Sequence, residues 1–439
     1  MTRLIRARID SAALRANLQT IRARAPGCRV MAVVKANAYG HGLVPTALAL
    51  ADADAFAVAR LEEAVALRDA GLKRRIVLLE GVLDVAQLAQ AAELELDLVV
   101  HQAPQIALLE AFRGARPFPI WLKVDTGMNR LGFRPGEFRA AWERLRSLQP
   151  APLQLRVLTH LACADEADGS YTAEQLERLQ PLVAGLDVEL SIANSAAILA
   201  QPSTHAAWVR PGLALYGVSP FAGQRGAQLG LRPAMTLEST VIAVREVSAG
   251  ERVGYGGVWR ARRPSRLAII AAGYGDGLPR GIPSGAPVLI GSHRAPLAGR
   301  VSMDMIAADI TDLPPVSVGD RVELWGTHLA VEELAAAAGK DPVEYRRALL
   351  DRAPRARGVL DLAAEKAGWK TPLAAGVGRG VSVVFGFGSY VAQVAEVSVG
   401  DRVELWGTRV AVEELAAAAG TIPYELLCGV SQRVPIELD

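Results

Sequence analysis

The feature that most constrains this fold is a series of short apolar runs that alternate with stretches of helical spacing between Arg29 and Gly217. Eight runs occur, at Val30–Lys35, Ala55–Arg60, Arg75–Gly81, Leu96–His101, Pro119–Asp125, Leu155–His160, Val188–Asn194 and Trp208–Gly217. The segments between them, such as Leu61–Ala70 and Ala173–Ala184, place Leu and Ala on one face and charge on the other, as helices that cover a parallel sheet do. Eight strand–helix units predict an α/β fold with a (β/α)8 TIM barrel, and a doubly wound open sheet is the alternative.

A different pattern begins after Pro220, where apolar and polar residues alternate between Gly and Pro, as in Met235–Val247 and Arg266–Ala272. This alternation predicts a mostly antiparallel β-domain, which the alternating segment Met1–Ile9 is expected to join as a strand. The predicted domains are a barrel over residues 10–220, a β-domain over 221–339 with 1–9 and 421–439, and an insertion over 340–420.

The insertion is inferred from a repeat near the C-terminus. Val316–Gly339 and Val397–Gly420 differ only at His328/Arg409 and Leu329/Val410. A single pair is too few for a solenoid, which needs at least about three stacked units. Removal of residues 340–420 leaves a chain that continues smoothly, and we expect the first copy to occupy the native position because it is synthesised first.

Composition restricts the classes of partner. Lys and Arg number 48 against 46 acidic residues, and this balance predicts no nucleic-acid or membrane partner and favours a small molecule. The N-terminus has no apolar run long enough for a signal peptide or a membrane span, so a cytoplasmic location is expected. Cys28, Cys163 and Cys428 lack metal-ligand spacing, and no metal site is predicted.

The ends of the predicted strands carry the residues with reactive chemistry. Lys35 leaves the first strand directly into a Gly-containing loop, and a partly desolvated lysine there can act as a nucleophile or can be an ordinary surface residue. Polar residues end the later strands as well, namely Lys123, Asp125, Arg130, His160, Asp165, Asn194, Ser195, Arg210 and Gly212. Because parallel barrels bind phosphate after strands seven and eight, Ser195 and the Gly212 backbone predict a phosphorylated cofactor beside the lysine.

Motifs in the same order resemble those of the alanine racemases. They are the run around Lys35, KVDTGMNRLG at Lys123–Gly132, THLACADE at Thr159–Glu166, Asn194-Ser195, RPGLALYG at Arg210–Gly217, VGYG at Val253–Gly256, GYGDG at Gly273–Gly277, GRVSMD at Gly299–Asp304 and YELLCGVSQRVP at Tyr424–Pro435. The resemblance covers the chain outside residues 340–420. It implies a pyridoxal-phosphate enzyme that interconverts L- and D-alanine, for peptidoglycan synthesis or for alanine catabolism.

The resemblance also implies roles for individual residues. Lys35 binds pyridoxal 5'-phosphate covalently and then transfers protons on the D face, while Tyr255 from a second subunit serves the L face. Arg210 contacts the pyridine nitrogen, with His160 supporting it. The phosphate is bound by Tyr39, Ser195, Gly212, Leu213 and Tyr424. Arg130 contacts the cofactor oxygen and, with Met303, the substrate. The access corridor is formed by Tyr274, Arg280, Arg300 and Asp165, and Lys123 is expected to be carbamylated.

Further implications concern assembly and the insertion. Shared active sites imply a homodimer. Within the insertion, the run Asp341–Trp369 resembles part of the molybdopterin-binding subunit of aldehyde or isoquinoline oxidoreductases, although no oxidoreductase activity is expected from so small a fragment. Three other interpretations stay open, namely a broad-specificity amino-acid racemase, a non-catalytic pyridoxal-phosphate carrier and a chimera made inactive by the insertion.

Overall fold

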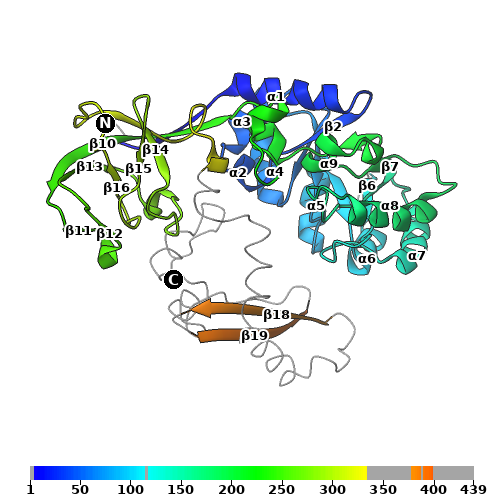
Figure 1. Cartoon of the computed structure of the whole chain (residues 1–439). Coiled ribbons are helices and arrows are strands. Elements are labelled where there is room, and N and C mark those ends of the chain that lie inside the picture. Colours follow the sequence, from blue (N-terminus) through cyan, green and yellow to red (C-terminus); the bar gives the residue numbers. More distant parts are fainter. Residues whose placement is uncertain (1–3, 114–116, 334–376, 387–388, 399–439) are drawn as a thin grey trace. The chain divides into compact units, whose positions relative to one another are not determined.

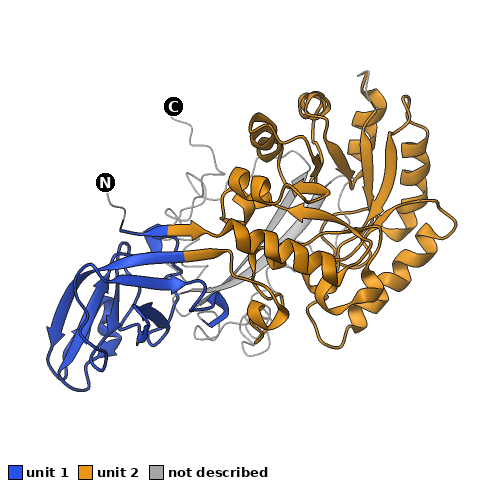
Figure 2. Cartoon of the chain, turned by 90° about the horizontal axis from the view of Figure 1, so that it is seen from above, with its two compact units in different colours: residues 1–6, 237–439 blue, residues 7–236 orange. Residues whose placement is uncertain are grey.

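A computed structural model describes residues 4–113, 117–333, 377–386 and 389–398. The chain divides into two compact units, one formed by residues 7–236 and the other by residues 1–6 and 237–439 (Figure 2). Unit 2 denotes the first of these and unit 1 the second.

Unit 2 contains a closed barrel of eight parallel strands, as predicted (Figure 1). In barrel order the strands are β2 (Arg29–Val33), β3 (Ala55–Val58), β4 (Arg75–Leu78), β5 (Asp97–Val100), β6 (Pro119–Lys123), β7 (Gln154–Leu158), β8 (Leu190–Ser191) and β9 (Trp208–Val209). Closure is made by β9, which pairs with both β8 and β2. The open-sheet alternative is therefore wrong.

Helices surround the barrel and bury their apolar faces against it. They are α1 (Ser11–Arg24), α2 (Lys35–Tyr39), α3 (Leu43–Ala49), α4 (Leu61–Asp69), α5 (Val85–Glu93), α6 (Ala103–Ala111), α7 (Pro135–Arg146), α8 (Ser170–Val183) and α9 (Ser195–Ala200), with 3-10 turns η1 (Pro202–Thr204), η2 (Leu213–Tyr216) and η3 (Gly226–Leu229). Local sequence fixes where α1 begins, because the Asp10 carboxylate caps the helix by accepting hydrogen bonds from Ala12 N and Ala13 N. Leu14, Leu18 and Ile21 then recur on one buried face.

The inside of the barrel is a packed core. Alternate strand residues point inward and form one buried cluster that includes Met31, Ala55, Val77 and Val99. The rings of Trp121 and Trp208 lie edge to face within it, with centroids 5.8 Å apart. A filled interior leaves only the strand ends available for binding a ligand.

A seven-stranded sheet, whose strands include residues 7–9 and 235–236 of unit 2, is the framework of unit 1. Its strands are β1 (Arg6–Ile9), β10 (Met235–Val247), β13 (Ser265–Ile270), β14 (Pro287–Ile290), β15 (His293–Pro296), β16 (Ile306–Asp309) and β17 (Arg321–Trp325), in the order β15-β14-β17-β10-β13-β16 with β1 on β10. The pairs β10–β13, β10–β17, β13–β16, β14–β15 and β14–β17 are all antiparallel. The predicted β-domain is thus present, and the N-terminal segment joins it. Two hairpins are also described, β11 (Arg252–Val253) with β12 (Trp259–Arg260), and β18 (Val377–Gly386) with β19 (Ser389–Ser398).

The division between the units lies at residues 236/237, beyond the boundary expected at 220/221. The intervening segment packs on the barrel side, where Leu231 and Ala234 join the unit 2 core. Asn17 of α1 fixes it further, since its side chain donates to Arg232 O at 2.8 Å and accepts from Arg232 N at 2.7 Å. These tertiary contacts, which composition does not reveal, decide the boundary.

Candidate active site

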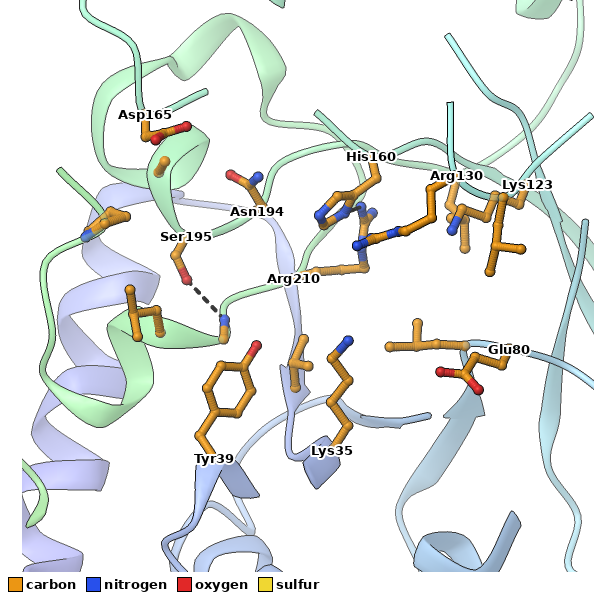
Figure 3. Close-up of a pocket in the computed structure, with 18 residues that line it drawn as sticks. Lys35, Tyr39, Glu80, Lys123, Arg130, His160, Asp165, Asn194, Ser195 and Arg210 are labelled. Carbon is orange, nitrogen blue, oxygen red and sulfur yellow. Dashed lines mark hydrogen bonds between the residues drawn. The ribbon is translucent and has the colours of Figure 1, made fainter. Parts of the chain in front are cut away.

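The polar residues at the strand ends line one cavity of about 520 Å³. Lys35 and Tyr39 come from the end of β2, Lys123 from β6, His160 from the end of β7, and Ser195 from α9. The other lining residues are Val33, Leu79, Glu80, Arg130, Leu131, Leu158, Asp165, Asn194, Ala196, Arg210, Gly212, Leu213 and Pro220. Figure 3 shows these side chains converging from different strand ends on a common space. The cavity therefore lies where a parallel barrel places its active site.

An unusual turn presents the first two of these residues. Residues 36–39 all have φ between 53° and 56°, which is the left-handed region that side chains avoid by about 1–2 kcal/mol each. The buried Glu63 carboxylate helps to hold this turn by accepting a hydrogen bond from Ala36 N at 2.7 Å. Lys35, directly before these residues, and Tyr39, the last of them, both line the cavity.

Arg210 is fixed at the base of the cavity. It is buried, and its Nη1 donates to Ser191 Oγ at 2.7 Å while its Nη2 donates to Thr159 O at 2.5 Å. Burial lowers the pKa of the Arg210 guanidinium to about 10, so the group stays cationic at neutral pH. The arrangement holds a permanent, oriented positive charge inside the barrel mouth.

His160 is a neutral neighbour of that arginine. Burial lowers the pKa of His160 well below its ordinary value, and the positive charges of Arg210 and Lys123 lower it further. Its Nδ1 lies 3.3 Å from Arg210 Nη2 and, in the neutral tautomer with Nδ1 unprotonated, accepts that hydrogen bond. His160 can therefore orient Arg210 without adding charge.

Lys123 is a buried lysine in strongly positive surroundings. Burial, followed by the charges of Arg210, Arg130 and Lys35, lowers its pKa to about 8, and Asp125 opposes the shift. At pH 7 roughly a tenth of Lys123 is consequently the free amine, against well under a thousandth of a lysine with the ordinary pKa. A free amine is a nucleophile, whereas an ordinary protonated lysine is not.

Ser195 and Gly212 form a cradle in which the serine oxygen is bonded to two backbone amides. Ser195 Oγ accepts a hydrogen bond from Gly212 N at 2.9 Å (Figure 3). It also accepts one from Ala214 N at 3.2 Å, where η2 begins. A Cβ on Gly212 would come within 2.6 Å of Tyr39 Oη, so a larger residue would push the tyrosine hydroxyl out of its place. Because both amides donate to Ser195 Oγ, the serine O–H is the donor that remains for an anionic group such as phosphate.

The other predicted residues belong to unit 1. Tyr255 follows β11 in the turn η4 (Tyr255–Gly257) and is 67% exposed. Tyr274 starts the turn η5 (Tyr274–Asp276) and is buried, and the adjacent Gly275 N donates to Met303 O at 2.9 Å. Arg300 lies beside the Tyr255 turn, 3.7 Å from where a Cβ on Gly256 would be. Unit 1 thus gathers the predicted partner-facing motifs on neighbouring turns.

One predicted residue lies beyond the described ranges, and one cavity residue was not predicted. Tyr424, predicted at the phosphate, lies outside the described residues. Glu80, which was not predicted, lines the cavity and lies opposite Lys35 in Figure 3. It comes after Leu79, just beyond the end of β4, so the strand-end rule that selected the other residues would also have selected it.

Among the residues that the structure describes, no helix is long and apolar enough to cross a membrane. Within the same ranges, no three His, Cys, Asp or Glu side chains are grouped so that they could hold a metal ion.

Family models match both parts of the chain. The model of the alanine racemase N-terminal domain matches residues 9–220, and that of the alanine racemase C-terminal domain matches residues 234–357 and 387–438. Most of the predicted insertion therefore falls within the second match. No support emerges from these comparisons for the resemblance to a molybdopterin-binding subunit.

Individual relatives agree with the family models. An alanine racemase of Shewanella amazonensis is 48% identical over 340 residues, which are 76% of this chain and 93% of the relative. The crystal structure of biosynthetic alanine racemase from Pseudomonas aeruginosa matches with a TM-score of 0.75 and 48% identity, covering 77% of this chain and 95% of that one. Alanine racemase from Bartonella henselae, solved with covalently bound pyridoxal phosphate, matches with a TM-score of 0.71 and 33% identity, covering 78% and 96%.

Proposed function

This chain belongs to the alanine racemase family, and from that premise we propose how its residues divide the work of interconverting L- and D-alanine. The activity is alanine racemisation, and the cofactor is pyridoxal phosphate. The observation that carries the division of roles is the convergence of Lys35, the buried Arg210 and the Ser195 cradle on one cavity.

The residues present fit this cofactor. The Ser195 hydroxyl at the Gly212 turn, with Tyr39 and Leu213 beside it, suits the phosphate, and Tyr424 is proposed to complete the site. Arg210 suits a hydrogen-bond acceptor such as the pyridine nitrogen, and Lys35 supplies the amine for covalent attachment. When bound, pyridoxal phosphate supplies the delocalisation that makes the substrate α-hydrogen acidic.

Racemisation requires proton transfer on both faces of the α-carbon. We assign the D face to the Lys35 amine and the L face to the Tyr255 hydroxyl of a second subunit. One group acting alone would return the proton to the side from which it was taken. The exposure of Tyr255 supports a role toward a partner, because an exposed aromatic in a Gly-flanked turn gains little from packing within its own subunit.

Arg210 limits side reactions. A guanidinium that is still cationic at neutral pH does not readily give up a proton, so it can donate a hydrogen bond without fully protonating its partner nitrogen. The neutral His160 keeps it in place. Less electron withdrawal leaves more charge at the α-carbon, which favours reprotonation there over transamination.

Substrate recognition is assigned to two groups of residues. Arg130 binds the cofactor oxygen and the substrate carboxylate, assisted by the Met303 backbone of a second subunit. Tyr274, Arg280, Arg300 and Asp165 form the corridor that restricts the side chain of the substrate. The chemistry of arginine supports the role of Arg130, since a cationic guanidinium binds a carboxylate through two hydrogen bonds.

Assembly and location complete the proposal. Shared sites require a homodimer, because Lys35 and Tyr255 would come from different subunits. We place the enzyme in the cytoplasm, supplying D-alanine for peptidoglycan or degrading alanine. The molybdopterin resemblance within 340–420 stays a sequence-based prediction, and its part outside the described residues has no structural account.

The direct test combines cofactor and activity in one sample. Purified protein with added pyridoxal phosphate should show a visible absorbance band and convert L-alanine into D-alanine, with serine and lysine converted more slowly. A band without racemisation would favour the carrier or the inactive chimera. Comparable rates on all three amino acids would favour the broad-specificity racemase.

A prediction about pH follows from the proposed modification of Lys123. Free amines add CO2 to give a carbamate and a proton. At pH 8, a lysine with a pKa of about 8 has far more free amine than a lysine with the ordinary pKa of 10.5. With ¹³C-bicarbonate we expect a carbamate NMR signal that grows from pH 6.5 to 8.5. The resulting negative charge would offset Arg130 and Arg210.

Lys123→Arg is the matched control, since it keeps the positive charge but cannot form this carbamate, and it should lack the signal. An unchanged signal in that variant, or none from the native protein at pH 8.5, would contradict the assignment.

A further inference from the structure

One buried side chain of α8 bonds to both loops that carry charged groups into the cavity. Gln175 is fully buried. Its Nε2 donates to Thr126 Oγ1 at 3.2 Å, in the loop that leads to Arg130. The same nitrogen donates to His160 O at 3.0 Å, and Oε1 accepts from Ala162 N at 2.9 Å. A single amide thus joins the loop after β6 to the loop after β7.

Two neighbours on α8 hold the first loop by its backbone. Tyr171 Oη donates to Gly127 O at 2.8 Å, and Arg178 Nη1 donates to Thr126 O at 2.9 Å. Gly127 has φ +147°, and a Cβ there would lie 2.8 Å from each of those two side chains. The positive φ disfavours any other residue here, and an added Cβ would push the ends of both side chains away from the loop.

The same loop is closed at its base. The Asp125 carboxylate accepts hydrogen bonds from Gly127 N and Asn129 N, both at 3.0 Å, and Asp125 N donates to Phe133 O at 2.9 Å. The loop is thus pinned at both its base and its α8 side. Arg130 lies on the remaining part and lines the cavity.

The second loop is bonded in turn to the buried arginine. Thr126 Oγ1 and Thr159 Oγ1 are 2.9 Å apart, and Thr159 O accepts from Arg210 Nη2. His160 Nδ1 contacts the same nitrogen. A displacement of either loop would therefore move Arg130 relative to Arg210.

We propose that Gln175 is a positioning residue for the racemase reaction, fixing the Arg130 and His160 loops relative to each other, with Tyr171 and Arg178 assisting. The proposal rests on the substrate-binding role assigned to Arg130. An apolar residue of similar volume would fill the space beneath the loops equally well. Such an apolar residue could not form the three hydrogen bonds that fix the positions of the two loops.

The test compares Gln175→Met, which keeps the length of the side chain and removes its amide, with Tyr171→Phe, which removes one hydroxyl from a partly exposed residue. In the full-length protein loaded with pyridoxal phosphate, we expect an unchanged visible band. The KM for L-alanine should rise about tenfold in Gln175→Met and less in Tyr171→Phe. Inhibition by propionate, a carboxylate without an amine, should weaken in parallel. Gln180→Ala, at an exposed position of the same helix, is the matched control and should change neither.

Arg130→Gln separates this inference from the proposed function. It should weaken propionate inhibition, and adding Gln175→Met to it should weaken inhibition by less than about twofold more, because the two act through one contact. No effect of Arg130→Gln would refute the substrate role of Arg130. If Arg130→Gln acts but Gln175→Met and Tyr171→Phe leave KM and propionate inhibition unchanged, the positioning role is wrong, whatever happens to the melting temperature. Fully multiplicative effects in the double variant would overturn it as well.

Discussion

Lys35→Ala should abolish the visible absorbance that arises from covalent attachment of pyridoxal phosphate and lower racemisation by about 10⁴-fold or more. Lys35 lies at the end of β2, and the left-handed turn that follows directs it to the cavity. Alanine removes both the amine that attaches the cofactor and the group that transfers protons on the D face. The measurement is the absorbance spectrum before and after borohydride reduction, which fixes a cofactor bound through a lysine.

Two lysine variants serve as controls for this experiment. Lys73→Ala, at an exposed position, should leave absorbance and activity intact. Lys123→Ala should keep the covalent absorbance, although it lies in the same cavity. If borohydride still attached the cofactor to the Lys35→Ala protein, another lysine would have to be the attachment site.

Tyr255→Phe should lower racemisation by about 10²–10⁴-fold, the range typical of a lost acid–base group. The ring is 67% exposed, so removing its hydroxyl should leave the melting temperature and the cofactor band unchanged. Lys35 should still exchange the α-hydrogen of D-alanine in deuterated water. The two rates are measured separately by NMR and by chiral chromatography. Near-native racemisation by this variant would refute the two-group scheme.

Mixing the two inactive variants tests the shared site. If Lys35 and Tyr255 act from different subunits, a mixed dimer contains one site with both native residues and one with neither. Random exchange makes half of the dimers mixed, so about a quarter of native activity should return. Recovery should depend on subunit exchange during unfolding and refolding. No recovery, or a fully active monomer in sedimentation, would show that each subunit is complete by itself.

The sequence alone was sufficient to predict the barrel and most of the residues that line the cavity. Each strand carries its own apolar run, and a parallel barrel brings every strand's C-terminal end to one rim, so Lys35, Lys123 and Arg210 could be assigned to one site before any coordinates. Glu80 satisfies the same rule and was overlooked. The antiparallel unit was equally readable because its alternation has the period of the sheet.

Other features depended on tertiary contacts. Residues 221–236 belong to the barrel unit because Asn17, some two hundred positions earlier, bonds to Arg232. The left-handed turn at 36–39 contains no glycine, and nothing in its composition indicates such a conformation. Gln175 resembles any polar helix residue in the sequence, and its three bonds to two loops exist only in the folded unit.

The difference has a physical origin. Strand ends, apolar faces and glycine turns follow from local stereochemistry, which each segment carries in its own residues. The position of Arg130 relative to His160, and the protonation of Lys123, depend on burial and on charges brought together from distant segments. The loop positions and the lysine pKa are determined only once the barrel has closed. Before folding, water screens these charges and the flexible chain keeps the groups apart.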